Sequence, residues 1–201
     1  GNIGNPILSE KKITPKTVFV IEASSYQLEY SKIFKSHLAA ILNISPDHLE
    51  RHGSIRNYIK AKFKLIKTQT KKDFTFLNTN NLFIKRYLSG QKILSKIIKI
   101  NKTVQSKVLK KIDNSNFLSD GNKENLSFVF EIAKKMKISK NNLFKVLQKF
   151  NGLDFRQQVI FKSKNLIIIN DSKATSFSST VSILRSITNV HWIVGGQAKK
   201  G

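Results

Sequence analysis

Short apolar runs recur along this chain, and segments with helical periodicity separate them. The run at 17–25, TVFVIEASS, is nearly continuous in apolar residues until Glu22. Runs of this kind suit strands that are buried on both faces of a parallel sheet. Strands that alternate with helices are typical of α/β proteins. The sequence therefore predicts an α/β fold with a mostly parallel sheet flanked by helices.

The expected elements can be placed along the chain. Strands are predicted at 17–25, 37–45, 73–81, 152–161, 165–170 and 190–196, and helices at 25–34, 54–69, 122–138, 139–150 and 178–187. Short strands and a helix are expected between Leu82 and Phe117. Ser139 is the expected N-cap of a helix. Gly152 is expected to end that helix and to open a second domain, which divides the chain into domains at 1–151 and 152–201.

Composition excludes several kinds of site. The 201 residues include no cysteine, which removes disulfides, thiolate metal sites and cysteine catalysis. No apolar run approaches the ~20 residues that a membrane-spanning helix needs, so no membrane association is expected. The chain begins with Gly1 rather than Met and ends in a glycine-rich turn. We therefore expect it to be a piece of a longer protein.

The net charge of +24 has two explanations. A charge of this size is typical of nucleic-acid-binding proteins, and it also arises in lysine-rich proteomes. The basic residues are mostly lysines scattered along the chain, and they are not interleaved with aromatic residues and base-reading arginines. These features favour the compositional explanation. We expect no specific nucleic-acid partner, only weak and salt-sensitive attraction to polyanions.

Two polar side chains follow the first two predicted strands. Glu22 lies near the end of the first strand, and His48 follows Asp47 just after the second. Because the carboxyl ends of parallel strands meet at one edge of a sheet, Glu22 and His48 could converge on one cation, and oxygen-rich ligation suits Mg²⁺. Taken alone, Glu22 is equally well explained as an acid at the solvent edge. His48 alone is better explained as a loop-capping histidine.

Three further positions carry suitable chemistry. Lys62 lies on the helix after the His48 loop, among many other lysines. Asp171 and Lys173 follow the strand predicted at 165–170, where an acid and a lysine two residues apart can orient phosphate and a metal-bound water network. Lys62 could equally be an ordinary surface lysine, and Asp171 and Lys173 could belong to an ordinary strand-to-helix connection. These positions therefore indicate a function only when they are considered together.

Together, these motifs resemble the Mur ligase family in order and spacing. The resembling motifs are GNIG at Gly1, IEASSYQLE at 21–29, LNISPDHLERHGS at 42–54, YIKAKFKLI at 58–66, NKEN at Asn122, GLDFRQQ at Gly152, INDSKATS at 169–176 and VGGQAKKG at Val194. NDSKAT after a buried strand favours the members that add D-glutamate over their sister ligases. The resemblance covers nearly the whole chain and is weakest from Leu82 to Phe117.

The resemblance implies a cytoplasmic, ATP-dependent ligase of peptidoglycan synthesis. In that family ATP phosphorylates a substrate carboxylate, and the amine of an amino acid attacks the acyl phosphate to form an amide. For the D-glutamate-adding members the substrates are UDP-N-acetylmuramoyl-L-alanine and D-glutamate, with ATP and two Mg²⁺ ions as cofactors. The resemblance also implies a monomer when full length. It makes 1–151 the central ATP-binding domain and 152–201 the start of a Rossmann-like, amino-acid-binding C-terminal domain.

The resemblance also assigns roles to individual residues. Glu22 and His48 would hold Mg²⁺, and Lys62 matches a lysine that the family carbamoylates, a change that would let it hold the second ion. The other matched positions bind ligands. ATP-binding positions are matched by Asn122, Arg156, Asp171 and Lys173, and substrate-binding positions by Asn2, Ser24, Gln27, Thr175 and Lys199, the last at the D-glutamate carboxylate.

The chain departs from the family pattern in several places. The family's phosphate-binding loop and N-terminal UDP-binding domain are absent from this sequence, so the chain alone is expected to be inactive. Gly121 stands where a histidine is usual. Asp154-Phe155 replaces a usual Pro-His pair, and Gln157-Gln158 replaces residues that include an acid. These departures concern the adenine contacts and the domain hinge.

Two alternatives stay open from the sequence. The first is another ligase of the superfamily, such as the L-alanine-adding or diaminopimelate-adding enzyme or folylpolyglutamate synthase, which assays with different amino acids would separate. The second is a basic α/β domain that binds nucleic acid without catalysis. Binding across a salt series tests the second, because phosphate contacts give a steep salt dependence.

Overall fold

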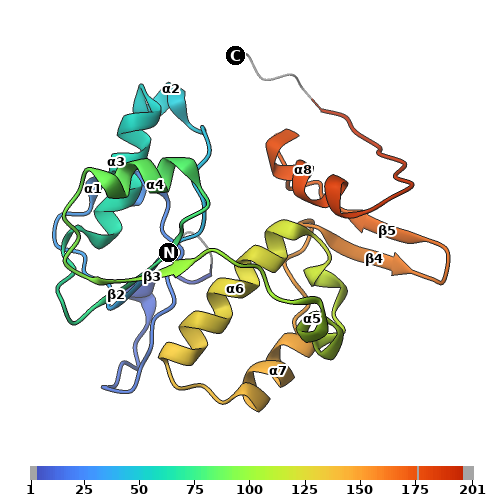
Figure 1. Cartoon of the computed structure of the whole chain (residues 1–201), viewed down its shortest axis with the longest axis horizontal. Helices are drawn as coiled ribbons and strands as arrows, with labels where there is room; N and C mark the ends of the chain where they lie inside the picture. The colour runs from blue at the N-terminus through green and yellow to red at the C-terminus, as the bar shows by residue number, and fades with distance from the viewer. Residues whose placement is uncertain (1–3, 176, 197–201) are drawn as a thin grey trace. The chain divides into compact units, whose positions relative to one another are not determined.

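The computed structural model describes residues 4–175 and 177–196. The chain forms two compact units, Gly1–Asn101 and Lys102–Gly201 (Figure 1). The two units are distinguished by how the chain packs on itself. The boundary expected at Gly152 concerns the domains of a family and stays a prediction.

A parallel sheet of three strands is the centre of the first unit. Its strands are β1 (Leu38–Ile41), β2 (Phe74–Asn78) and β3 (Lys96–Ile100), in the order β1-β2-β3. Ala40 pairs with Phe76, which in turn pairs with Ile98. The parallel sheet confirms the predicted fold class. It also confirms the strands expected after residues 37 and 73.

Helices precede and connect these strands. They are η1 (Ile7–Ser9), α1 (Ser25–Tyr30), α2 (Leu49–His52), α3 (Ile55–Lys67) and α4 (Leu82–Ser89). The buried face of α3 contributes Tyr58, Phe63 and Ile66 to a core cluster that also contains Ile41 of β1 and Leu77 of β2. This amphipathic packing is the reason the helix predicted at 54–69 forms.

The second unit is built mainly from helices and one hairpin. Its elements are α5 (Ser106–Ile112), η2 (Ser115–Phe117), α6 (Asp120–Lys135), α7 (Lys140–Gln148), β4 (Gln158–Lys162), β5 (Ile167–Asn170) and α8 (Phe177–Ser186). Ile112, Leu126 and Leu143 form the centre of a cluster between α5, α6 and α7. Ser139 caps α7 by accepting a hydrogen bond from the Asn142 N–H, as predicted.

Two predicted strands are wrong among the described residues. The segment at 17–25 forms no strand before α1 begins, and the Val20 side chain is 96% exposed. The segment at 190–196 is also irregular, with Ile193 98% exposed. Neither segment pairs with a neighbouring strand in the part of the chain that the structure describes. The apolar sequences of these two segments therefore did not predict strand pairing.

Two smaller expectations for the second unit also change. β4 and β5 pair antiparallel, so these two strands do not extend a parallel sheet. The Rossmann-like character expected after residue 152 stays a prediction. The helix expected to end at Gly152 ends at Gln148. Gly152 instead lies in the following connection with φ of +73°, where a Cβ would come within 2.6 Å of Asn116 Oδ1.

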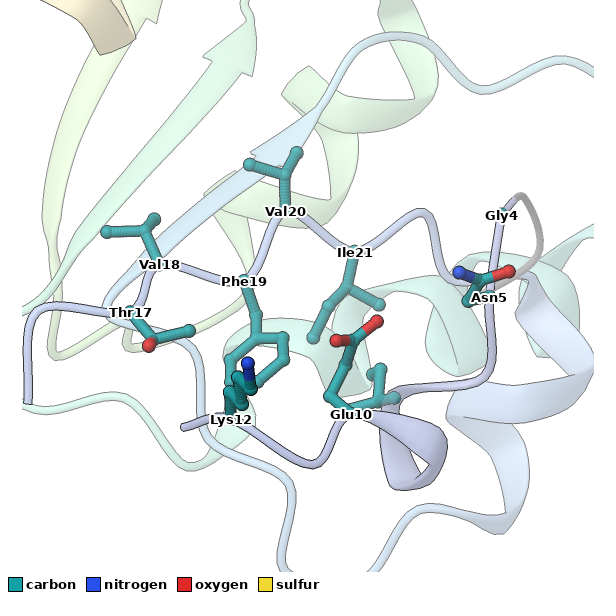
Figure 2. A pocket seen from close by; sticks show the side chains of 10 residues that line it. Gly4, Asn5, Glu10, Lys12, Thr17, Val18, Phe19, Val20 and Ile21 are labelled. Carbon is teal, nitrogen blue, oxygen red and sulfur yellow. The ribbon is translucent and has the colours of Figure 1, made fainter. Parts of the chain in front are cut away.

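A hollow near the start of the chain lies between the segment 4–12 and the extended segment 17–21 (Figure 2). Its lining mixes the polar side chains of Asn5, Glu10 and Lys12 with the apolar side chains of Phe19 and Ile21. None of the candidate site residues that the structure describes lines it, so it does not enter the chemistry below. No helix among the described residues is long and apolar enough to cross a bilayer.

Candidate active site

Lys62 lies on α3, one helical turn after Tyr58. The i,i+4 spacing places the two side chains on one face of the helix. The Lys62 Nζ atom lies 5.0 Å from the centroid of the Tyr58 ring, within the range of a cation–π contact. The Tyr58 side chain is buried, so the lysine is held at the edge of the core rather than in bulk solvent.

Two carboxylates share the surroundings of Lys62. Burial lowers the pKa of the Lys62 ammonium, and the charges of Asp47 and Glu22 act in the opposite direction. Burial also raises the pKa of the Tyr58 hydroxyl, with Asp47 again contributing. Glu22, from the segment before α1, and Asp47, from the loop after β1, therefore act on one ammonium group.

His48 is next to this charge cluster. It lies between β1 and α2 with a left-handed backbone, φ 54° and ψ 32°. Its backbone N–H donates to Asp47 Oδ1 over 2.9 Å, and its ring lies edge-on to Tyr26, 5.2 Å between centroids. Its Nε2 lies 3.5 Å from Asp47 Oδ2. The structure thus brings His48 and Asp47 together, and Asp47 and Glu22 both act on Lys62.

Aromatic rings connect the elements around this cluster. The His52 ring, from α2, lies 5.5 Å from the Tyr26 ring of α1 and 5.4 Å from the Tyr58 ring of α3. The His52 side chain is buried, and its Nε2 lies 3.0 Å from Ser25 Oγ. These contacts fix α1, α2 and α3 against one another. Tyr26, His52 and Tyr58 were not singled out from the sequence, although the spacing of Tyr58 and Lys62 on a predicted helix is a signal that could have indicated their pairing.

The substrate-side candidates of this unit lie at the start of α1. Ser24 is the N-cap, where its Oγ accepts a hydrogen bond from the Gln27 N–H. The Gln27 Oε1 atom in turn accepts from the Ser24 N–H over 2.9 Å. This reciprocal capping box fixes the side chains of Ser24 and Gln27 at the start of α1, which follows Glu22 in the sequence. Asn2 lies outside the described residues.

The donors in this region suit a magnesium ion. Among the described residues, no three His, Cys, Asp or Glu side chains form a group that could hold a metal ion. Mg²⁺ in nucleotide enzymes is commonly held by only one or two carboxylates together with substrate phosphates and water. Asp47 lies beside His48, and Asp47 and Glu22 both act on Lys62, so a metal ion here would need ligands beyond these side chains.

A second set of candidate residues lies in the other unit. Asn122 is in the first turn of α6, and its Nδ2 donates to Asn116 O over 2.7 Å and to Gln157 Oε1 over 3.2 Å. The Gln157 backbone N–H donates to Asp171 Oδ1 over 3.1 Å. Gln157 therefore links Asn122 to Asp171, two candidates that are far apart in the sequence.

The remaining candidates of this unit are held mainly by their backbones. The Lys173 N–H donates to Phe155 O over 3.0 Å, and the Arg156 N–H donates to Leu153 O over 3.1 Å. The side chains of Arg156, Lys173 and Thr175 are exposed. The Asp171 Oδ2 atom is buried and accepts no hydrogen bond from the described residues. Lys199 lies outside the described residues.

Two positions where the sequence departs from the expected motif have clear structural roles. The Gly121 N–H donates to Ser182 Oγ of α8 over 2.7 Å, and a Cβ on Gly121 would lie 2.9 Å from that oxygen. Gln157 joins Asn122 to Asp171, as described above. Nothing in the local sequence around Gln157 indicates this contact, because its partners lie in separate elements.

Sequence comparison places the chain in a family. Residues 3–148 match the family described as "Mur ligase middle domain". The fold is that of an α/β protein with a parallel sheet, and two carboxylates, Asp47 and Glu22, act on Lys62 of α3. The chain belongs to the Mur ligase family.

Curated relatives give a more specific likeness. The chain is 33% identical to the UDP-N-acetylmuramoylalanine–D-glutamate ligase of Rickettsia felis, and the match covers 100% of the chain and 48% of that protein. It is 33% identical to the ligase of the same name from Elusimicrobium minutum and 31% identical to that from Clostridioides difficile, each with 48% of the relative covered. The chain thus spans about half the length of these relatives.

A solved structure supports the fold. MurF from Acinetobacter baumannii matches with a TM-score of 0.58 and 14% sequence identity, covering 83% of this chain and 40% of that one. At this level of identity the match concerns the fold alone.

Proposed function

We propose that the protein containing this chain is an ATP-dependent ligase that joins UDP-N-acetylmuramoyl-L-alanine to D-glutamate through an acyl phosphate. Membership of the Mur ligase family and the names of the relatives support the reaction and the substrates. The observation that carries the proposal is that Asp47, in contact with His48, and Glu22 both act on the ammonium group of Lys62. The cytoplasm, where ATP and nucleotide-linked precursors meet, is the expected location.

The difficulty of this reaction is electrostatic. A substrate carboxylate must attack the terminal phosphorus of a polyphosphate, and both reactants are anions. Glu22 and His48 would hold a Mg²⁺ ion, which supplies positive charge to the phosphate oxygens when bound. Preorganised positive groups in a partly buried site stabilise such charge far better than water does.

Lys62 would hold the second ion as a carbamate. Carbon dioxide reacts with a neutral amine, which becomes a carbamate anion and releases a proton. Burial favours the neutral amine of Lys62, and the carboxylates of Asp47 and Glu22 oppose it. The geometry is therefore compatible with this modification.

The other residues would bind ATP and the two substrates. Asn122, Arg156, Asp171 and Lys173 would bind ATP, with Asn122 at the adenine. Asn2, Ser24 and Gln27 would bind the UDP-muramoyl substrate, Thr175 its acyl side or the incoming amino acid, and Lys199 the carboxylate of D-glutamate. The amine of D-glutamate then attacks the acyl carbon, loses a proton, and displaces phosphate as the amide forms.

Phosphate release by the complete natural protein tests this proposal. With ATP, Mg²⁺ and UDP-N-acetylmuramoyl-L-alanine, release should depend on D-glutamate and not on L-alanine, diaminopimelate or L-glutamate. Lys62→Ala should lower kcat/KM on the order of 100-fold, because it removes a charged group next to the transferred phosphoryl group. Lys60→Ala, on the exposed side of the same helix, is the matched control and should leave the rate unchanged. Turnover with a different amino acid, or a Lys62→Ala rate equal to that of Lys60→Ala, would contradict the proposal.

A further inference from the structure

The turn that joins α6 to α7 concentrates positive charge (Figure 1). Residues 134–140 read KKMKISK, with four lysines, and no Asp or Glu occurs between positions 134 and 150. Lys137 and Lys140 are exposed, and neither forms an ion pair with a carboxylate of the described residues. The charges of these two side chains are therefore not neutralised by the part of the chain that the structure describes.

Aliphatic side chains are exposed among these lysines. Met136 is 39% exposed and Ile138 is 43% exposed, and Lys137 lies between them in the sequence. Side chains of this kind are usually buried, because their contact with water is unfavourable. On the outer side of α7, Val146 is 65% exposed and follows the exposed Lys145. Basic and aliphatic side chains therefore share this end of the second unit.

The turn has a defined conformation, so the exposure of its side chains is part of the fold. The N–H groups of Met136 and Ile138 donate to carbonyl oxygens in the last turn of α6, over 2.8 and 2.9 Å. Ser139 then caps the start of α7. Lys137 has a left-handed φ of 58°, at a position after a helix where glycine or asparagine is more usual. The backbone thus holds a lysine and two aliphatic residues at the surface of the turn.

A bilayer that contains anionic lipids complements both kinds of side chain. Its surface attracts lysines, and the boundary between headgroups and acyl chains accepts aliphatic side chains. The stems of the lysines can lie along this apolar boundary while their ammonium groups stay among the phosphates. A nucleic acid also offers phosphates, but binding to single strands commonly adds aromatic side chains on which bases stack. No residue at 134–140 is aromatic, so the composition favours the lipid surface.

We propose that the α6–α7 turn, residues 134–140, is a peripheral membrane-binding surface that holds the protein reversibly at a bilayer with anionic lipids. No helix among the described residues could cross a bilayer, and binding at the surface needs none. The expectation of no membrane association came from the lack of a spanning segment, and this proposal revises it. The inference goes beyond the proposed ligase reaction and does not depend on it.

Sedimentation of the complete natural protein with lipid vesicles tests the role of the charges. The protein should bind vesicles made of equal parts phosphatidylcholine and phosphatidylglycerol, and it should not bind vesicles of phosphatidylcholine alone. Lys137→Glu combined with Lys140→Glu should lower the partition coefficient on the order of 100-fold, because each lysine near an anionic surface contributes about fivefold and each added acid opposes binding. Lys11→Glu combined with Lys16→Glu is the matched control, with the same change of net charge at two exposed lysines outside the turn, and should retain most of the binding.

A second pair of variants tests the aliphatic side chains. Met136→Ser combined with Ile138→Ser should lower the partition coefficient by about tenfold, because methylene groups buried in the bilayer contribute to binding that salt does not screen. Ile33→Ser is the matched control, since Ile33 is 92% exposed and follows a lysine elsewhere in the chain. Circular dichroism establishes that each variant is folded before its binding is compared.

Several outcomes would overturn the proposal. No binding of the natural protein to the anionic vesicles does so without any variant. Equal losses in the two double charge variants would show that net charge alone attracts the protein. An oligonucleotide whose binding is lost in the Lys137→Glu and Lys140→Glu variant, while vesicle binding is kept, would identify nucleic acid as the partner of the turn. Vesicle binding needs no turnover, so its result is distinguishable from a failure of the proposed ligase reaction.

Discussion

Asp73 is a buried carboxylate whose hydrogen bonds determine its protonation. The side chain is 2% exposed, and its Oδ2 accepts from the Thr70 N–H over 2.7 Å and from the Thr70 hydroxyl over 2.9 Å. Lys35 Nζ lies 3.4 Å from the same oxygen. The Thr70 backbone hydrogen bond is the largest cause that lowers the pKa of Asp73, and burial partly opposes it. The folded state therefore favours the charged carboxylate of Asp73.

The lowered pKa of Asp73 predicts a pH-dependent loss of stability. A carboxyl with a lower pKa in the folded state stabilises that state above its unfolded pKa of about 3.9, and the contribution is lost as pH falls through the folded pKa. Asp73→Asn should therefore lower the free energy of unfolding at pH 7, and its difference from the wild-type chain should shrink below about pH 4. Urea unfolding followed by circular dichroism at several pH values measures both. Glu10→Gln, at an exposed acid, is the control, and a difference that stays constant with pH would argue against the role of the Asp73 charge.

The residues of the candidate site differ in how far their sequence context revealed them. Glu22 and His48 were predicted because acids and histidines after buried strands meet at one sheet edge. No strand forms at 17–25, and Glu22 acts on the Lys62 ammonium from an extended segment. The convergence of Glu22 and His48 on one cation stays a prediction. Gln157 could not be predicted, because its partners Ser119, Asn122 and Asp171 are brought to it only by folding.

At the scale of elements, α8 caps the start of α6. The first N–H groups of any helix lack partners within the helix. In α6 the Asp120 N–H donates to Ser186 Oγ over 3.0 Å, and the Gly121 N–H donates to Ser182 Oγ over 2.7 Å. Ser119 accepts the next free N–H, that of Asn122. The absence of a side chain at Gly121 allows this close approach of α8.

These caps predict a stability cost for two serine substitutions. Ser182→Ala and Ser186→Ala should each lower the free energy of unfolding by about 1 kcal/mol, because each leaves a helix N–H without its acceptor. Gly121→Ala should also destabilise the chain, although alanine is the better helix former, because its Cβ would meet Ser182 Oγ. Thermal unfolding of the three variants measures the effect. Ser172→Ala, at an exposed turn, should change nothing, and equal stability of all four variants would show that α8 does not cap α6.

Most elements were predictable, and the exceptions share one cause. The helices α3, α6 and α7 follow from apolar residues at helical spacing and from serine caps at Ser54, Ser119 and Ser139. A strand also requires a neighbour to accept its hydrogen bonds, which is a tertiary contact that no local pattern encodes. The runs at 17–25 and 190–196 have the composition of strands without such a neighbour among the described residues. The antiparallel pairing of β4 and β5 was missed, although the short connection between these two strands predicts a hairpin.

At the scale of the whole molecule, charge and length limit what the chain can do. The net charge of +24 is spread over many lysines, so it favours weak binding of polyanions and steers anionic substrates toward the protein. It does not create a catalytic site. The chain also spans about half the length of its relatives, with 48% of the Rickettsia felis ligase covered.

The sequence contains no glycine-rich loop ending in Lys-Ser or Lys-Thr, the element that cradles nucleotide phosphates in many ATP-using enzymes. Without such a loop, the residues around Lys62 would face a polyphosphate that little else holds in place, and positioning supplies much of the rate of phosphoryl transfer. The 201-residue chain, mixed with ATP, Mg²⁺, UDP-N-acetylmuramoyl-L-alanine and D-glutamate, should therefore release no phosphate above background. The complete natural protein at the same concentration is the positive control, and circular dichroism of the chain establishes that it is folded in the assay. Steady turnover by the folded chain would mean that the residues described here bind and position ATP without a separate phosphate loop.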